Sequence, residues 1–239
     1  MRRVLVTGGG SGIGRAVARA FAEAGDAVTI TGRRSDALEE TAEGFDMTCR
    51  TADVTDEASV KALFDAPYAV VVANAGSGTP AKVRDTTLAD WNAQIAVNLT
   101  GTFLTFREAL HGMETGGRLI AVASTASLQG QANVAAYAAA KHGVLGLVRS
   151  LAHEVSKEGI TCNAVCPYFV DTPLTDRGVA GLMKRMEIDE DEARAMVEKN
   201  NPIGRLIAPE EVAAAVTYLA SPGAAMVNGH ALSISGGMI

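Results

Sequence analysis

Short apolar, β-branched runs alternate with amphipathic segments along the whole chain, and this alternation restricts the fold more than any other feature. The apolar runs cover residues 3–8, 26–32, 69–76, 117–124 and 160–167. Near-continuous apolar character is typical of parallel strands that helices cover on both faces. Segments with apolar residues at helical spacing lie among them, at residues 12–25, 35–45, 88–111 and 135–158. This order predicts an α/β fold, a doubly wound parallel sheet that forms one domain over residues 1–239.

Composition and charge narrow the class of partner. The net charge is -6 at pH 7, whereas a nucleic-acid-binding surface normally shows a basic excess. No apolar run reaches the length of a bilayer span, and the run before Gly8 is too short for the core of a signal peptide. We therefore expect a cytoplasmic protein that acts on a small molecule, with neither a nucleic acid nor a membrane as partner.

Two of the three cysteines are four residues apart in a predicted strand. Cys162 and Cys166 lie at even spacing, so both side chains point to one face of the sheet. No histidine or further cysteine stands nearby to complete a tetrahedral metal site. We interpret both as buried core residues and predict no metal.

One polar, helix-prone segment interrupts the alternation before a last helix that begins near Pro209. It runs from Thr172 to Asn201 and contains the acidic stretch 187–192, which is typical of a solvated helix face. Open α/β sheets bind ligands beyond the carboxyl ends of their strands, where this segment begins. We therefore predict that residues 173–201 form a helical substrate lid inserted after the sixth strand.

A glycine-rich loop, VTGGGSGIG, joins the first predicted strand to the first predicted helix. Gly8, Gly12 and Gly14 permit a tight turn, let a pyrophosphate approach the backbone and leave helix N–H groups aimed at the anion. Ser11 and Ile13 lie in the same loop. A strand before this pattern and a helix after it indicate a dinucleotide-binding Rossmann fold.

The end of the second predicted strand discriminates between the two nicotinamide dinucleotides, because an acid there binds the free ribose 2′-hydroxyl of NAD. This chain has Arg33 and Arg34 at that point, and two guanidinium groups suit a 2′-phosphate. The sequence thus favours NADP(H). NAD(H) is the alternative, since Asp36 lies close by and Ser11 stands where a basic residue would have supported the phosphate.

The helix-prone stretch AYAAAKHG carries two polar side chains on an otherwise bland surface. Tyr137 and Lys141 are four residues apart, so in a helix they point the same way. A phenol has a pKa of about 10, and a neighbouring ammonium favours its ionised form. The pair therefore indicates proton transfer, although a half-buried tyrosine beside a snorkelling lysine has the same spacing.

Several motifs together resemble the short-chain dehydrogenase/reductase family from about Val4 to the C-terminal SISGGMI. They are TGGGSGIG, NAG at 74–76, NLTGTF at 98–103, Ser124, and YAAAK at 137–141. The segments KHGVLGL, GITCNAVCP and NPIGRLIAPEEVAAAVTYLASPGAAMVNG look like those of 3-oxoacyl reductases, polyketide ketoreductases and 3-hydroxybutyrate dehydrogenases.

The resemblance implies a catalytic set of Asn98, Ser124, Tyr137 and Lys141. Tyr137 would exchange a proton with the substrate oxygen, Ser124 would hydrogen-bond that oxygen, and Lys141 would also bond the nicotinamide ribose. Asn98 would hold a water that connects the proton path to solvent. With the loop residues and arginines above, the implied cofactor-binding set is Gly8, Ser11, Gly12, Ile13, Gly14, Arg33, Arg34, Asp53, Val54, Asn74, Ala75, Gly76, Tyr137, Lys141, Pro167, Val170 and Thr172. In it Asp53 and Val54 would flank the adenine, and Val170 and Thr172 would hold the nicotinamide carboxamide.

Two departures from the family pattern affect the site and the sheet. Tyr168 follows Pro167 where the family usually has glycine, which predicts either a changed approach to the nicotinamide or a wall of the substrate pocket. The segment 56–68 is shorter than the family's usual helix at that place, which predicts a trimmed sheet face away from the site.

The motifs and the resemblance together predict an NAD(P)-dependent oxidoreductase that transfers a hydride between nicotinamide and a ketone or secondary alcohol. A 3-oxoacyl or 3-hydroxyacyl thioester ranks first as substrate, and a free hydroxy acid, a sugar or a cyclic alcohol ranks second. A protein that senses NADP(H) without turnover is the alternative of a different class. The resemblance also implies a homotetramer built partly on the helices around Asn98 and Tyr137.

Overall fold

The computed structural model describes residues 1–239 and contains one seven-stranded sheet in which every pairing is parallel. The strands are β1 (Arg3–Thr7), β2 (Ala27–Gly32), β3 (Met47–Thr51), β4 (Val70–Ala73), β5 (Arg118–Val122), β6 (Thr161–Pro167) and β7 (Ala231–Ile234). Their order across the sheet is β3-β2-β1-β4-β5-β6-β7. The first three strands are therefore laid down toward one edge of the sheet, and the strands from β4 onward are laid down toward the other edge. The predicted doubly wound parallel sheet is confirmed.

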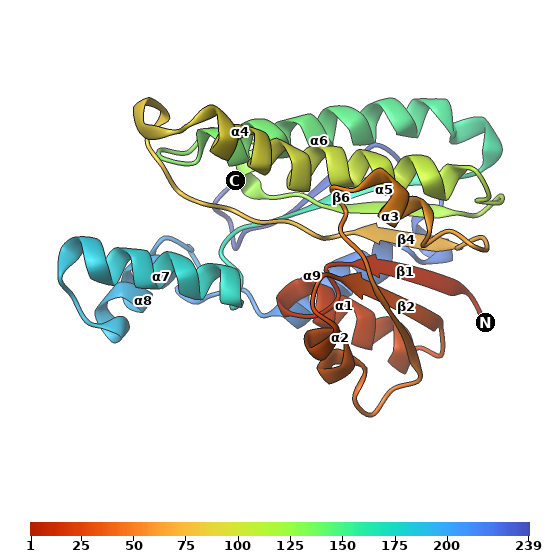
Figure 1. Cartoon of the computed structure of the whole chain (residues 1–239), viewed down its shortest axis with the longest axis horizontal. Coiled ribbons are helices and arrows are strands. Elements are labelled where there is room, and N and C mark those ends of the chain that lie inside the picture. Colours follow the sequence, from red (N-terminus) through yellow and green to blue (C-terminus); the bar gives the residue numbers. More distant parts are fainter.

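Helices cover both faces of this sheet (Figure 1). They are α1 (Gly12–Glu23), α2 (Ser35–Ala42), α3 (Glu57–Lys61), α4 (Leu88–Ile95), α5 (Gly101–Leu110), α6 (Ala135–Glu154), α7 (Pro173–Met186), α8 (Glu190–Lys199) and α9 (Pro209–Leu219). No helix of the chain combines the length and the apolarity needed to cross a membrane.

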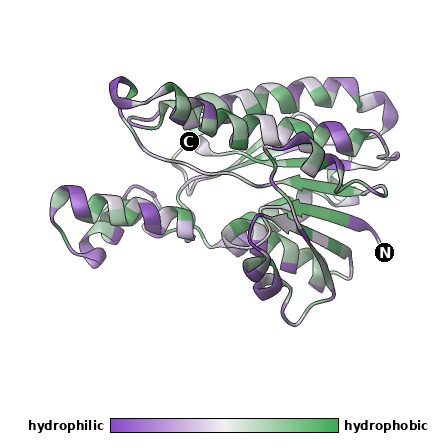
Figure 2. Ribbon diagram, viewed as in Figure 1, coloured by the Kyte–Doolittle hydropathy of each residue, from purple (hydrophilic) through white to green (hydrophobic).

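Alternate residues of the strands feed two separate apolar cores. In β1, Leu5 faces the core beneath α5 and α6, whereas Val4 and Val6 face the core beneath α1 and α9. Figure 2 shows the strands as the most continuously hydrophobic part of the ribbon, as expected for a sheet covered on both sides. Cys162 and Cys166 are both fully buried in the first of these cores, which confirms their interpretation as core residues.

The helical stretch predicted at residues 88–111 is divided by a wider turn. A π-helical turn, Ala96–Thr100, separates α4 from α5 and contains Asn98. Such single turns insert an extra residue into the helix and re-aim the side chains that follow. The segment after residue 56 forms only α3, a helix of 5 residues, in agreement with the shortening seen in the sequence.

Helices α7 and α8 form a hairpin that stands away from the sheet (Figure 1). Their contact is a small apolar core of their own, made of Val179, Ala193, Val197 and Leu206. The two ends of the hairpin meet at a neck, where Val170 and Ile207 form an isolated parallel bridge. The acidic stretch at 187–192 is solvent-exposed apart from Ile188, as predicted for a solvated face.

Candidate active site

The glycine-rich loop turns sharply between β1 and α1, at the carboxyl edge of the sheet. Gly8 and Gly12 have φ angles of 66° and 51°, a region that glycine adopts without strain. A Cβ atom on Gly14 would overlap the carbonyl oxygen of Gly8, so helix and loop pack this closely only without a side chain. Ser11 precedes α1 without capping it, and the first turn has no acidic residue. The N–H groups at this helix end therefore stay free for an anion.

Thr7 and Asn74 fix the glycine loop to the end of β4. The Thr7 hydroxyl accepts hydrogen bonds from the backbone N–H groups of Asn74 at 3.0 Å and Ala75 at 3.1 Å. The Asn74 amide donates in turn to the carbonyl oxygens of Thr7 at 2.9 Å and Gly8 at 3.1 Å. Asn74 thus shapes the loop from behind rather than facing an open site. Sequence reasoning does not identify Thr7, although a hydroxyl directly before the first glycine is a usable signal.

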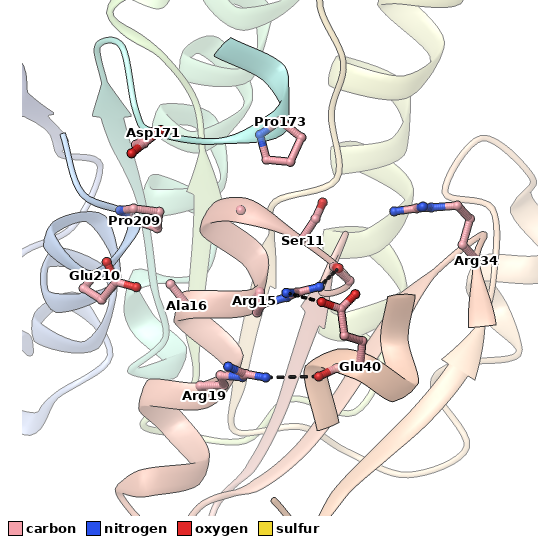
Figure 3. A pocket seen from close by; sticks show the side chains of 12 residues that line it. Ser11, Arg15, Ala16, Arg19, Arg34, Glu40, Asp171, Pro173, Pro209 and Glu210 are labelled. Carbon is pink, nitrogen blue, oxygen red and sulfur yellow. Dashed lines mark hydrogen bonds and ion pairs between the residues drawn. The ribbon is translucent and has the colours of Figure 1, made fainter. Parts of the chain in front are cut away.

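A pocket of about 470 Å³ opens beside the amino end of α1, between the glycine loop and Arg34 (Figure 3). Arg15 lines it but is already engaged. Its guanidinium donates to the carbonyl oxygen of Gly10 at 3.0 Å, to the Glu40 carboxylate at 2.8 Å and to the Thr41 hydroxyl at 3.1 Å. This ion pair lowers the pKa of Glu40, and the two opposite charges compensate each other. Arg15 therefore braces the loop and is not a free cation.

Arg33 and Arg34, in contrast, are exposed at the end of β2, and their side chains take part in no hydrogen bond or ion pair within the chain. Hydrogen bonds from Thr55 lower the pKa of Asp53, and the nearby positive charge of Arg33 adds to the effect. Asp36 lies in the first turn of α2 and is also exposed. This edge of the sheet consequently presents two unpaired guanidinium groups beside the pocket.

Val54, expected at the adenine, is buried, whereas Gly76, expected to line the cofactor, lies beside the predicted catalytic residues. Val54 is buried, and a Cβ on Gly101 would lie 2.9 Å from its Cγ2 atom, so only its backbone remains for an adenine ring. Gly76 lies between two predicted catalytic side chains. A Cβ there would be 2.8 Å from the Asn98 Oδ1 atom and 3.6 Å from the Lys141 Nζ atom.

Helix α6 brings Tyr137 and Lys141 to the end of β5, where Ser124 begins a short 3₁₀ turn. The Lys141 Nζ atom donates a hydrogen bond to the Val122 carbonyl oxygen at 2.8 Å and lies 5.7 Å from the centre of the Tyr137 ring. Ser124 lies beside the Tyr137 phenol, close enough to lower its pKa. The structure thus brings together three side chains that the sequence separates, while their chemical roles stay predictions.

Burial dominates the ionisation of this pair. It raises the pKa of Tyr137, and the neighbouring Ser124 side chain opposes this only in part. Burial also lowers the pKa of Lys141 from 10.5 to about 8. The expectation that Lys141 by itself favours a phenolate therefore does not hold, because desolvation sets the direction of the Tyr137 shift and Lys141 is not among the groups that oppose it.

Asn98 is fully buried in the π-helical turn. Its amide nitrogen donates to the carbonyl oxygens of Ser77 and Gln94, both at 2.9 Å, which uses its two hydrogens. Its amide oxygen accepts from the Ser77 backbone N–H at 3.2 Å. Only an oxygen atom of Asn98 is therefore left to hold a water.

The loop after β6 approaches the glycine loop. A Cβ on Gly12 would lie 3.0 Å from the Thr172 Cγ2 atom, so Thr172 sits directly over the turn. The backbone N–H of Val170 makes no hydrogen bond within the chain. Pro167 is buried at the strand end, and Tyr168 packs against the core beneath α9 with its ring 4.5 Å from that of Phe169. The phenol of Tyr168 thus joins the core instead of forming a free wall.

These observations fit a nicotinamide dinucleotide. The uncapped helix end and the glycine cradle suit a pyrophosphate, and half-buried Ile13 packs below them. The free N–H of Val170 suits a carboxamide oxygen. Lys141 is only 4% exposed, and two of its three N–H donors have no partner in the chain, which suits ribose hydroxyls.

Comparison with known proteins agrees with this geometry. Residues 8–239 match the family model described as enoyl-(acyl carrier protein) reductase. The chain is 40% identical to the cis-4-hydroxycyclohexanecarboxylate dehydrogenase of Sinomonas cyclohexanicum, over 99% of this chain and 97% of that protein. It is 37% identical to the 3-oxoacyl-[acyl-carrier-protein] reductase FabG of Vibrio harveyi, over 98% and 96%.

Among solved structures, a variant of actinorhodin polyketide ketoreductase with NADPH superposes with a TM-score of 0.94. The two chains are 34% identical, and the match covers 99% of this chain and 97% of that one. Both sequence and structure therefore show that this chain is an oxidoreductase of the short-chain dehydrogenase/reductase family.

Proposed function

We propose that the protein reduces the keto group of a 3-oxoacyl thioester with NADPH, and oxidises the corresponding 3-hydroxyacyl thioester in reverse. The observation that carries the chemistry is the contact of Ser124 with the Tyr137 phenol, one helical turn from the buried Lys141 ammonium. Hydrogen-bonding and proton-donating groups that converge on one point are what a developing alkoxide requires. A sensor without turnover has no need of this convergence.

In this mechanism a nicotinamide, when bound, would supply the hydride for the carbonyl carbon. Ser124 donates a hydrogen bond to the carbonyl oxygen and fixes its position. Tyr137 donates its proton to that oxygen. The burial that raises its pKa keeps the phenol protonated and ready to donate at neutral pH. Lys141 holds the ribose through its two unused donors, and an oxygen of Asn98 holds the water through which the proton is replaced.

The same geometry supports our proposal for the cofactor residues. Gly8, Ser11, Gly12 and Gly14 hold the pyrophosphate, and Asp53 with the backbone of Val54 flanks the adenine. Arg33 and Arg34 bind the 2′-phosphate, because their exposed side chains make no ion pair within the chain and Arg34 lines the pocket. NADP(H) is therefore the proposed cofactor, and the NADPH in the actinorhodin ketoreductase structure supports it. NAD(H) is the second candidate.

The substrate class rests on the lid and on the relatives. Arg177, Lys184 and Arg185 are exposed on α7 and make no ion pair within the chain, so they are free to meet the phosphate of a pantetheine arm. FabG of Vibrio harveyi is named for the reduction of a 3-oxoacyl carrier-protein thioester. The cyclohexanecarboxylate dehydrogenase of Sinomonas cyclohexanicum favours a free cyclic hydroxy acid as the second candidate.

A substrate panel tests this proposal. Acetoacetyl-CoA, its free acid, a cyclic ketone and a ketose would each be offered with NADPH and with NADH, and the alcohols with the oxidised cofactors. We expect the highest kcat/KM for the thioester with NADPH. A higher value for a cyclic or free-acid substrate would assign the second class, and binding of cofactor without turnover of any compound would favour the sensor.

We also propose that residues 173–201 act as the substrate lid and that the protein assembles as a cytoplasmic homotetramer. Two separate groups of exposed apolar side chains suit two different contacts between copies. One lies around α4 and α5 and includes Leu88 and Phe103; the other lies near the C-terminus and includes Met226 and Ile239. All three cysteines are unpaired, as suits a reducing compartment. Sedimentation equilibrium of the wild type and of Phe103→Glu tests the assembly, which the charge should weaken.

A further inference from the structure

The loop that follows β4 crosses the candidate active site and is held at both ends. We call residues 76–81 the strap. At its far end, the backbone N–H of Ala81 donates to the carbonyl oxygen of Asn133 at 2.7 Å, directly before α6. At its near end, both backbone groups of Ser77 bond to the amide of Asn98. Between these anchors the strap passes over the phenol, since a Cβ on Gly78 would lie 3.5 Å from the Tyr137 ring.

A second amide holds the strap, and nothing in the proposed mechanism uses it. Gln94 is the one buried residue of α4, with 7% of its surface exposed. In the orientation that satisfies its amide, the nitrogen donates to the Ser77 carbonyl oxygen at 2.9 Å and the oxygen accepts from the Thr79 N–H at 3.1 Å. The backbone groups of Ser77 and Thr79 make no hydrogen bond to other backbone groups. Two side chains one helical turn apart therefore fix the strap.

We propose that Gln94 is a positioning residue for the reaction. By bonding Ser77 and Thr79 it keeps the backbone at Gly78 against one side of the Tyr137 ring, and so holds the phenol toward Ser124. A buried amide is costly unless both of its ends are bonded, and here both partners belong to the strap. Because the strap has no backbone ladder of its own, losing Gln94 frees its centre while Asn98 and Ala81 still hold its ends.

Three variants test this by turnover, in a readout that rests on the proposed reductase function. Gln94→Met keeps the volume but removes both hydrogen bonds, and kcat should fall about tenfold to a hundredfold, as for a small misplacement of a reacting group. NADPH affinity and cofactor-binding stoichiometry should stay at the wild-type level. Asn92→Ala, which removes an exposed amide from the same helix, is the matched control and should leave kcat unchanged. Wild-type kcat in Gln94→Met, or a loss matched by an equal loss of binding stoichiometry, would overturn the assignment.

Gln94→Glu adds a pH-dependent rescue. A protonated carboxyl has one donor and one acceptor and reproduces both contacts, whereas the ionised form lacks the donor and opposes the Ser77 carbonyl oxygen. The ratio of its kcat to that of the wild type should therefore rise as the pH falls from about 8 to about 6, because burial raises the pKa of a carboxyl. The same ratio for Gln94→Met should stay flat. A flat ratio for both variants would contradict the positioning role.

Hydrogen exchange tests the contact without any substrate. The Thr79 amide is protected by its bond to Gln94, so its exchange in the cofactor-free chain should be faster in Gln94→Met, while the Ala81 amide, bonded to Asn133, should keep its rate. Unchanged protection of Thr79 would overturn the proposal. Faster exchange in a protein whose wild type reduces no ketone would leave the strap contact established and reject the proposed function instead.

Discussion

The ammonium of Lys141 donates a hydrogen bond to the carbonyl oxygen of Val122 at 2.8 Å, and this is its one hydrogen bond within the chain. A buried cation with a single acceptor is poorly solvated, which is why its pKa falls to about 8. In the proposed mechanism, the ribose hydroxyls of the cofactor supply the missing acceptors. The arrangement makes the cofactor-free protein less stable than its packing alone would allow.

This cost predicts a pH-dependent difference in stability. Between pH 8 and 10.5 the folded chain binds fewer protons at Lys141 than the unfolded chain, so the free energy of unfolding rises with pH in that window. Below about pH 8 the full penalty is present. Lys141→Met should therefore gain stability relative to the wild type at pH 7, by at most about 3 kcal/mol, and lose this advantage toward pH 10. Urea unfolding of both cofactor-free proteins across this range measures the difference, and two parallel pH profiles would contradict it.

Much of the fold could be predicted because its causes are local in sequence. The apolar runs that became β1, β4, β5 and β6 are buried on both faces, so their pattern is nearly continuous. Strand β3 has none of this signal: it lies at the sheet edge, its sequence is MTCRT, and none of its residues is buried. Strand β7, at the other edge, is only partly buried, so it could not be predicted from a continuous apolar run either.

The features of the candidate site also divide into those with a local cause in the sequence and those without one. The glycine loop, the arginine pair and the spacing of Tyr137 and Lys141 are visible in the sequence because each is set within a few residues. The π-helical turn around Asn98 is not, since its cause is the fit of that amide to Ser77, which is 21 residues away. The role of Gln94 could not be predicted for the same reason. A glutamine on a helix is expected to be solvent-exposed, and only the three-dimensional structure shows that the strap covers it.

Replacing the phenol separates an enzyme from a sensor. Tyr137→Phe removes one oxygen and should lower kcat by about 10² to 10⁴-fold, the usual contribution of a positioned proton donor, while NADPH still binds. Lys141→Ala should weaken cofactor binding and turnover together, because its two free donors are lost. In the oxidation direction, where the phenolate accepts the proton of the alcohol, this variant should regain activity at high pH, because the phenol then ionises without the neighbouring charge. The measurements are kcat over a pH series with an accepted ketone and with its alcohol, and cofactor affinity by fluorescence titration; wild-type turnover by Tyr137→Phe would reject the mechanism.

We expect the choice between NADP(H) and NAD(H) to depend on the exposed guanidinium groups of Arg33 and Arg34. Replacing both Arg33 and Arg34 by Ala should raise the Kd for NADPH, since hydrogen bonds to a charged group contribute about 1.5–3 kcal/mol each, and should leave the Kd for NADH nearly unchanged. Both side chains are exposed to solvent, so we expect the loss of NADPH binding energy to lie at the lower end of this range. High salt should make the loss smaller, because it screens exposed charges. Lys157→Ala removes an exposed charge near the opposite edge of the sheet and serves as control. A wild type that prefers NADH in kcat/KM would refute the assignment.

The lid prediction concerns Arg194, which ties α8 to the loop before α7. Its guanidinium lies 2.5 Å from Asp171 and 3.5 Å from Asp176, and it pairs with Glu198 on its own helix at 3.7 Å. Asp171 stands between Val170 and Thr172, so this cluster links the hairpin to the residues proposed to hold the carboxamide. Exposed ion pairs contribute at most about 1 kcal/mol, which sets the expected size of the effect.

If the hairpin closes over substrate, thermolysin should cut within residues 173–201 more slowly when cofactor and product are bound than in the free protein. Arg194→Met should speed cleavage of the free protein about two- to fivefold, as follows from losing up to about 1 kcal/mol of local stability. It should also raise the KM for the ketone more than it changes kcat, because the lid orders substrate without touching the proton donor. Lys199→Met, on the same helix and outside any ion pair, should leave both values unchanged. Equal cleavage of free and bound wild type would show that the hairpin is a fixed wall, and the Arg194 cluster would then serve stability alone.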